Sequence, residues 1–140
     1  MPGEAIKACQ RALQLFPQDS ISLSTLGLLY VEQGEGSEVG LSLCSKALAL
    51  DNFNPDHWYR LGRALLYVGK QAEALDAIRQ CLRLRRNHVE GVLLLGTIYQ
   101  TMGRGNLARR YFLQALTVKG GTEKQIVQGQ KHLAQISESV

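Results

Sequence analysis

Residues 58–69, with the sequence WYRLGRALLYVG, contain the pattern that decides the fold. Trp58 stands four residues before Gly62, an apolar residue follows three positions after that glycine, and a second glycine closes the stretch. The same arrangement surrounds Gly27 and Gly96, at spacings of 62 − 27 = 35 and 96 − 62 = 34 residues. A fixed period near 34 residues predicts an array of helical repeats.

The spacing within each unit predicts helices. Trp58, Leu61 and Leu65 recur at the interval of one helix face. Gly62 lies on that face without a side chain, so a partner helix can approach closely; this offsets the helix-interior penalty of about 1 kcal/mol relative to alanine. Three further glycines suit the left-handed residue that ends a helix: Gly34, Gly69 and Gly103.

The repeated unit resembles the tetratricopeptide repeat family, whose signature is W-x2-L-G-x2-Y, then A-x3-F, then P. The second half of the signature is matched four times, at Ala5, Cys9, Ala12; Gly40, Cys44, Ala47; Ala74, Ile78, Cys81; and Ala108, Phe112, Ala115. Pro17 falls at the proline position of the family, whereas later units have other residues there. The resemblance implies an all-α, right-handed α-solenoid of stacked antiparallel helix pairs.

The expected organisation is a single array over residues 1–140. We expect eight helices, near 4–16, 20–33, 37–51, 55–68, 71–85, 89–102, 105–118 and 122–138. They group into the second helix of a truncated repeat, three repeats and a polar capping helix, at 4–19, 20–54, 55–88, 89–121 and 122–140. Because the first of these helices lacks its usual partner, Ile6 and Leu13 are expected to be partly exposed or covered by another copy of the chain.

Composition and motifs argue against catalysis. The chain has 140 residues, is 45% hydrophobic and 20% charged, and contains no apolar run of the roughly 18 residues that a membrane span requires. None of the histidines, His57, His88 and His132, has a partner at a metal-binding or catalytic spacing, so no enzyme activity, metal or cofactor is expected. The three cysteines fall at core positions, as buried free thiols of a reducing compartment, which indicates an intracellular, cytoplasmic protein.

The resemblance implies a function in protein–protein interaction. In this family the first helices of the repeats line a concave groove, and the corresponding residues here are Ser24, Leu28, Val31, Tyr59, Arg63, Leu66, Leu93, Thr97 and Gln100, with Val127 and Lys131 extending the groove. We expect a scaffold or adaptor that binds a peptide segment or partner helix there, as part of a larger multi-protein assembly. The alternative is that some of the apolar residues pack between helices.

Two other partners are weighed against this reading. A subgroup of the family binds the acidic tails of chaperones with a Lys and Asn clamp, but Ser24 and Leu28 stand in the first two clamp positions, which disfavours that ligand. The net charge of +4 and a series of arginines indicate an alternative partner, which is nucleic acid or an acidic protein. These arginines are Arg79, Arg83, Arg85, Arg86, Arg104, Arg109 and Arg110. Aromatic residues do not interleave with them, so a solvated helix face explains them more simply.

Overall fold

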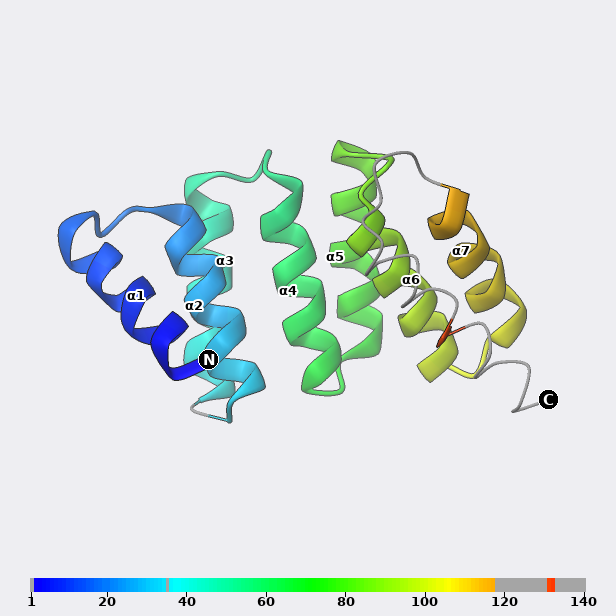
Figure 1. Ribbon diagram of the computed structural model, residues 1–140, viewed down its shortest axis with the longest axis horizontal. Coiled ribbons are helices and arrows are strands. Elements are labelled where there is room, and N and C mark those ends of the chain that lie inside the picture. The colour runs from blue at the N-terminus through cyan, green and yellow to red at the C-terminus, as the bar shows by residue number, and fades with distance from the viewer. Residues whose placement is uncertain (1, 35, 118–130, 133–140) are drawn as a thin grey trace. The chain divides into compact units, whose positions relative to one another are not determined.

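The computed structural model describes residues 2–34, 36–117 and 131–132, and the regular elements in this part of the chain are all helices (Figure 1). The helices are α1 (Pro2–Leu15), α2 (Ser20–Glu32), α3 (Ser37–Leu50), α4 (Pro55–Tyr67), α5 (Gln71–Leu84), α6 (Val89–Thr101) and α7 (Gly105–Thr117). They confirm the all-α helical repeat fold and begin and end within two residues of the predicted bounds. The expected capping helix at 122–138 lies outside the described residues, apart from the helical Lys131 and His132.

The chain divides into two compact units, Met1–Leu84 and Arg85–Val140, called unit 1 and unit 2 below. In unit 1, α2 packs against α1, α3 and α4, while α4 also packs against α3 and α5. In unit 2, α6 packs against α7. Consecutive helices in unit 1 run in opposite directions, as the ribbon shows (Figure 1). The first helices of successive repeats in this unit, α2 and α4, are therefore direct neighbours.

Each helix pair depends on a close approach at the repeated glycine. A Cβ atom on Gly62 would lie 3.0 Å from Cγ1 of Ile78, and one on Gly96 would lie 2.5 Å from Cε1 of Phe112. In the α2–α3 pair, a Cβ on Gly27 would meet the carbonyl oxygen of Gly40. These contacts confirm that the glycines at the repeated position face a partner helix within their own repeat.

The helix ends also follow the sequence. Gly34, Gly69 and Gly103 have φ angles of 73°, 87° and 77°, which confirms the left-handed positions. Behind Gly69, the Lys70 amide donates to the carbonyl of Leu65 at 2.9 Å, closing the last turn of α4. Pro55 occupies the first turn of α4, and the Asn54 side chain accepts a hydrogen bond from the Asp56 amide.

The second helices supply small or apolar residues to the core. Cys44, Ile78, Cys81 and Phe112 are fully buried. All three cysteines are free thiols, and Cys9 is half-buried. In α1, which has no fully buried residue, Ile6 and Leu13 are half-buried, so part of their apolar area is open as expected. Self-association through this helix stays a prediction.

Candidate functional site

The contact between α2 and α4 buries two residues that we expected on an open surface. Leu28 and Val31 are 8% and 1% exposed, and they form a cluster with Ala64 of α4, with Val68 packed against it. This corrects their expected place in the groove. The reason is that α4 packs directly on α2, so the apolar side chains between the two helices fill that contact.

Ser24 is a second correction, because its side chain lies in the interior at 0% exposure. Its hydroxyl group lies 3.0 Å from Nδ1 of His57 and accepts a hydrogen bond from Arg60 at 3.0 Å. The other ring nitrogen of His57, Nε2, lies 3.0 Å from the hydroxyl of Ser20. A serine is tolerated here because residues of α4 satisfy its polar group. Ser24 therefore joins the two first helices and is not available to a ligand.

The charge state of this network follows from its surroundings. Burial, and then the Arg60 guanidinium 3.4 Å from Nδ1, lower the pKa of His57, while three nearby aspartates oppose the shift. Since Nδ1 faces a cation, the neutral ring carries its proton on Nε2 and donates it to Ser20. A serine next to a histidine can be a catalytic pair, but both side chains are fully buried. The pair is structural.

Next to this contact, three polar side chains meet at the surface. Arg63 of α4 donates from Nε and Nη2 to the same carboxylate oxygen of Glu32 in α2, at 3.1 and 2.8 Å. Burial alone would lower the pKa of Arg63. Tyr59 and Glu32 outweigh burial, so the pKa of Arg63 is raised. Tyr59 also supplies a side-chain hydrogen bond to Arg63. Because the Arg63 side chain is 45% exposed, the ion pair adds at most about 1 kcal/mol to stability. Its main effect is to orient the guanidinium.

The sequence did not identify Glu32 or Tyr67 as members of this surface. Tyr67 is 60% exposed and stands four residues after Arg63, which itself stands four after Tyr59. This i, i+4, i+8 spacing places all three on one face of α4. Glu32 lies four residues after Leu28, so the same spacing could have identified it. We call Glu32, Tyr59, Arg63 and Tyr67 the α4 surface.

The remaining expected groove residues are mixed in exposure. Leu66 is half-buried in unit 1. In unit 2, Leu93 is 4% exposed, which corrects its expected place, whereas Thr97 and Gln100 are half-buried. The Thr97 hydroxyl donates to the Leu93 carbonyl at 3.0 Å, within its own helix. Of the six expected groove residues in unit 1, three thus stay accessible in whole or in part: Tyr59, Arg63 and Leu66.

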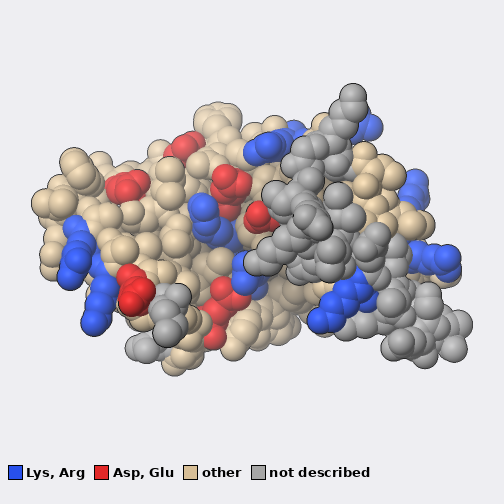
Figure 2. All heavy atoms as spheres, viewed as in Figure 1, with Lys and Arg blue, Asp and Glu red and all other residues tan. Residues whose placement is uncertain are grey.

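Charged side chains of both signs mix on the face of unit 1 drawn in Figure 2. The arginines of the alternative surface are all exposed, and Arg79 lies 3.9 Å from Asp76. In the described part of the chain, no three or more His, Cys, Asp or Glu residues are grouped closely enough to hold a metal ion. Nor does any helix described here have the length and apolar character needed to cross a bilayer.

Comparison with known proteins agrees with the helix pairs. Two protein-family models, each described as a tetratricopeptide repeat, match this sequence at residues 43–76 and 89–121. A thermophilic TPR protein of Thermus thermophilus superimposes with a TM-score of 0.84 over 96% of this chain and 72% of its own, at 19% identity. This chain belongs to the tetratricopeptide repeat family.

Two further tetratricopeptide proteins show how far the similarity extends. A TPR repeat-containing protein of Methanocaldococcus jannaschii is 34% identical over 70 residues, covering 50% of this chain and 12% of its own length. The first TPR of Spaghetti, solved bound to an HSP90 peptide, has a TM-score of 0.74 and 18% identity, covering 87% of this chain and 93% of its own. This chain spans 12% to 19% of the lengths of the curated relatives that it matches. Tetratricopeptide repeats mediate protein–protein interaction, through the extended surfaces that stacked repeats create.

Proposed function

We propose that this tetratricopeptide chain is a non-catalytic interaction module that binds a peptide segment of a partner protein on the α4 surface. The observation that carries the proposal is the arrangement of Tyr59, Arg63 and Tyr67 along α4, beside Glu32 of α2. Tyrosine and arginine are the residue types that most often dominate binding energy at interfaces.

The polar centre of the surface suits a peptide backbone. Arg63 is held by Glu32 and Tyr59, so little conformational entropy is lost when a ligand contacts it. Both bonds from Arg63 end on Oε2 of Glu32, which leaves the other carboxylate oxygen to accept from a peptide N–H. An extended segment carries donors and acceptors in alternation and can use both groups.

An acidic chaperone tail fits this surface poorly. The clamp positions Ser24 and Leu28 are buried, and Arg63 already pairs with a carboxylate. A ligand carboxylate would have to displace Glu32. We therefore propose a ligand with a neutral or mixed-charge centre and apolar side chains that contact Tyr59 and Tyr67.

The setting of this module is also proposed. Three free cysteines, two of them fully buried, are typical of a reducing, intracellular compartment. One curated relative, 24% identical over 111 residues, is named as subunit 3 of the anaphase-promoting complex, which supports a role within a larger assembly. Thr97 and Gln100 of α6 occupy the repeat positions equivalent to those of Arg63 and Leu66.

Selection from a displayed library of random 12-residue peptides tests the proposal. Selected peptides should shift the backbone NMR signals of α2 and α4 around Tyr59 and Arg63. Tyr59→Ala and Arg63→Ala should each weaken binding at least about tenfold, the effect expected of central interface residues. The matched control is the double variant Arg79→Glu, Arg83→Glu, on exposed arginines of α5, which should retain binding.

The reverse result would favour the alternative. If arginine reversal abolished binding, if Tyr59→Ala did not, and if affinity fell linearly with the logarithm of salt concentration, the ligand would be a polyanion held by the arginines.

A further inference from the structure

Unit 1 exposes apolar side chains at the two turns that lead into its first helices. Leu15 and Phe16 at the α1–α2 turn are 74% and 67% exposed, while Leu50 and Phe53 at the α3–α4 turn are 42% and 79% exposed. Ile21 follows at 55%. These five are the majority of the eight large apolar residues that are exposed in the described part of the chain. Single exposed apolar residues are ordinary, but a concentration at one place marks a contact surface.

Hydrogen bonds fix the backbone of both turns. In the first turn, the Asp19 amide donates to the carbonyl of Phe16 at 3.1 Å. In the second, the Phe53 amide donates to the Asp51 carboxylate at 3.1 Å, and the Asp56 amide donates to the Asn54 side chain at 2.9 Å. The exposed Phe16 and Phe53 therefore stand on turns whose backbone is hydrogen-bonded.

The two turns form one surface. Ser20, directly after the first turn, lies 3.0 Å from the ring of His57, which closely follows the second. Asp19 and Asp51 both act electrostatically on that ring. Both turns lie at the same end of the helices of unit 1 (Figure 1). We call this surface, made of residues 15–21 and 50–56, the turn edge.

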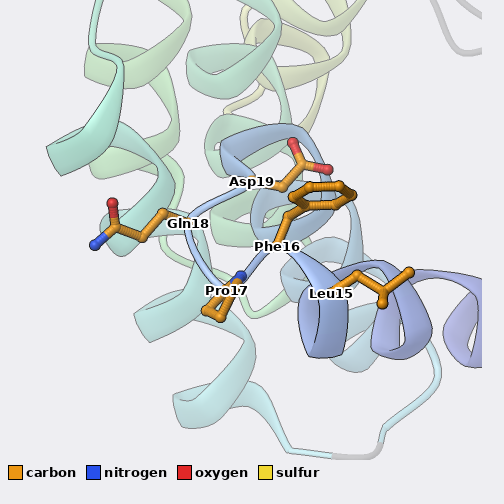
Figure 3. Close-up of a pocket in the computed structure, with 5 residues that line it drawn as sticks. All are labelled: Leu15, Phe16, Pro17, Gln18 and Asp19. Carbon is orange, nitrogen blue, oxygen red and sulfur yellow. The ribbon is translucent and has the colours of Figure 1, made fainter.

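The turn edge is hollowed at its first turn. An open surface cavity of about 640 Å³ is lined by Leu15, Phe16, Pro17, Gln18 and Asp19. Phe16 and Asp19 project to the same side of this turn, whereas Gln18 projects to the other (Figure 3). An apolar wall and a carboxylate thus stand together at the cavity.

The charge of the turn edge is opposite to that of the chain. The protein has a net charge of +4, yet residues 12–22 and 47–57 contain three aspartates and no lysine or arginine. The nearest cation in α4, Arg60, is half-buried and donates inward to Ser24. Red and tan surface follows this edge of unit 1 in Figure 2.

We propose that the turn edge is a second docking surface, for a segment of a partner protein that is both basic and apolar. Apolar side chains of the segment contact Phe16 and Phe53, and its lysines or arginines face Asp19 and Asp51. The charge sign selects this partner: complementary potentials attract a basic segment to an acidic edge even though the chain as a whole repels cations. This surface is separate from the α4 surface and does not depend on it.

Fluorescence anisotropy with a labelled 14-residue amphipathic peptide of Lys and Leu tests the proposal on the full chain. The peptide should bind, and peptides with Glu in place of Lys, or Ser in place of Leu, should not. The double variant Phe16→Ser, Phe53→Ser should weaken binding at least about tenfold, or about 1.4 kcal/mol. Asp51→Asn, which keeps an acceptor for the Phe53 amide, should weaken it about threefold and reduce its salt dependence, because Asp19 stays charged.

Matched controls make the result specific. Val39→Ser removes another exposed apolar residue of unit 1, at the start of α3, and should leave binding unchanged. Tyr59→Ala should also leave it unchanged, which separates this surface from the α4 surface. Equal binding of the Lys and Glu peptides, or an equal loss in Val39→Ser, overturns the proposal. So does a dimer in sedimentation that the Phe16→Ser, Phe53→Ser variant dissociates, because the occupant is then a second copy.

Discussion

A methyl group on Gly27 would lie 2.5 Å from the carbonyl oxygen of Gly40, and one on Gly40 would lie 2.5 Å from the carbonyl oxygen of Gly27. The two helices α2 and α3 therefore approach through main chain on both sides. The Sγ atom of Cys44 stands 2.7 Å from the same added atom on Gly27. This pair of glycines fixes the separation of the two helices.

Gly27→Ala should destabilise unit 1 by about 3 kcal/mol, at the upper end of the range for overpacking, because backbone cannot move aside as a side chain can. Urea denaturation followed by circular dichroism measures this. Gly105→Ala is the control: an added Cβ there meets nothing within 4 Å, so it should be neutral or stabilise by up to about 1 kcal/mol. Equal effects of the two substitutions would contradict the close contact.

Gly62→Leu should cost about 1–3 kcal/mol, while Gly62→Ala should cost less than Gly27→Ala. The nearest atoms to an added Cβ on Gly62 are Cγ1 and Cδ1 of Ile78, a side chain that can change its rotamer. The urea midpoints of the variants are compared, provided that their free energies of unfolding fall with urea concentration at the same slope. An unchanged midpoint in Gly62→Leu would remove the basis for pairing α4 with α5.

Stability should fall as the pH drops from about 6.5, the ordinary pKa of histidine, towards 5.5. The pKa of His57 is lowered in the folded chain, first by burial and then by Arg60. In this range the unfolded chain binds a proton that the folded chain does not, so protons favour unfolding. Urea midpoints at several pH values measure the slope.

His57→Gln should flatten this dependence. His132, whose pKa is lowered by burial and then by Lys131, gives a slope of the same sign, so the comparison is best made in a His132→Gln background. A slope unchanged by His57→Gln would show that the buried ring does not control it.

Cys9 should react first with a thiol reagent at pH 8, and Cys44 and Cys81 only after unfolding. Both later thiols are 0% exposed, and burial raises the pKa of Cys44 to about 12. Thiolates are the reactive species, so a buried thiol of high pKa is inert. Counting the thiols that react with and without urea checks this. The Cys9→Ser variant should lack the fast phase of the reaction.

The sequence predicted the helices well because their signals are local. The spacing of Trp58, Leu61 and Leu65, and the glycine after each first helix, need only neighbouring residues to be interpreted. The candidate site was predicted less well. Ser24 was placed in a groove because it stands at a groove position of the family's repeat, yet His57, which satisfies its hydroxyl group, is 33 residues away. Glu32 and Arg63 are 31 residues apart, so no local pattern reveals that the arginine is already paired.

The packing of first helices explains the remaining errors. A repeat register gives the direction of a side chain but not how closely the next helix approaches. Leu28 and Val31 are buried in a cluster with Ala64 of α4, the helix that packs on α2. The acidic turn edge was not predicted for a different reason. The net charge describes the chain as basic, but the charged residues are unevenly distributed along the sequence.

The Gly27–Gly40 contact has a genetic consequence. At Gly96, the obstacle to a larger residue is the Phe112 ring, so a Gly96→Ala defect can be relieved by a second substitution such as Phe112→Leu. At Gly27, the nearest obstacle is a carbonyl oxygen of a residue that is already the smallest available. No second-site suppressor in the facing helix can make that oxygen smaller. A selection for suppressors should therefore recover compensating changes in the facing helix for Gly96→Ala, and none in the facing helix for Gly27→Ala.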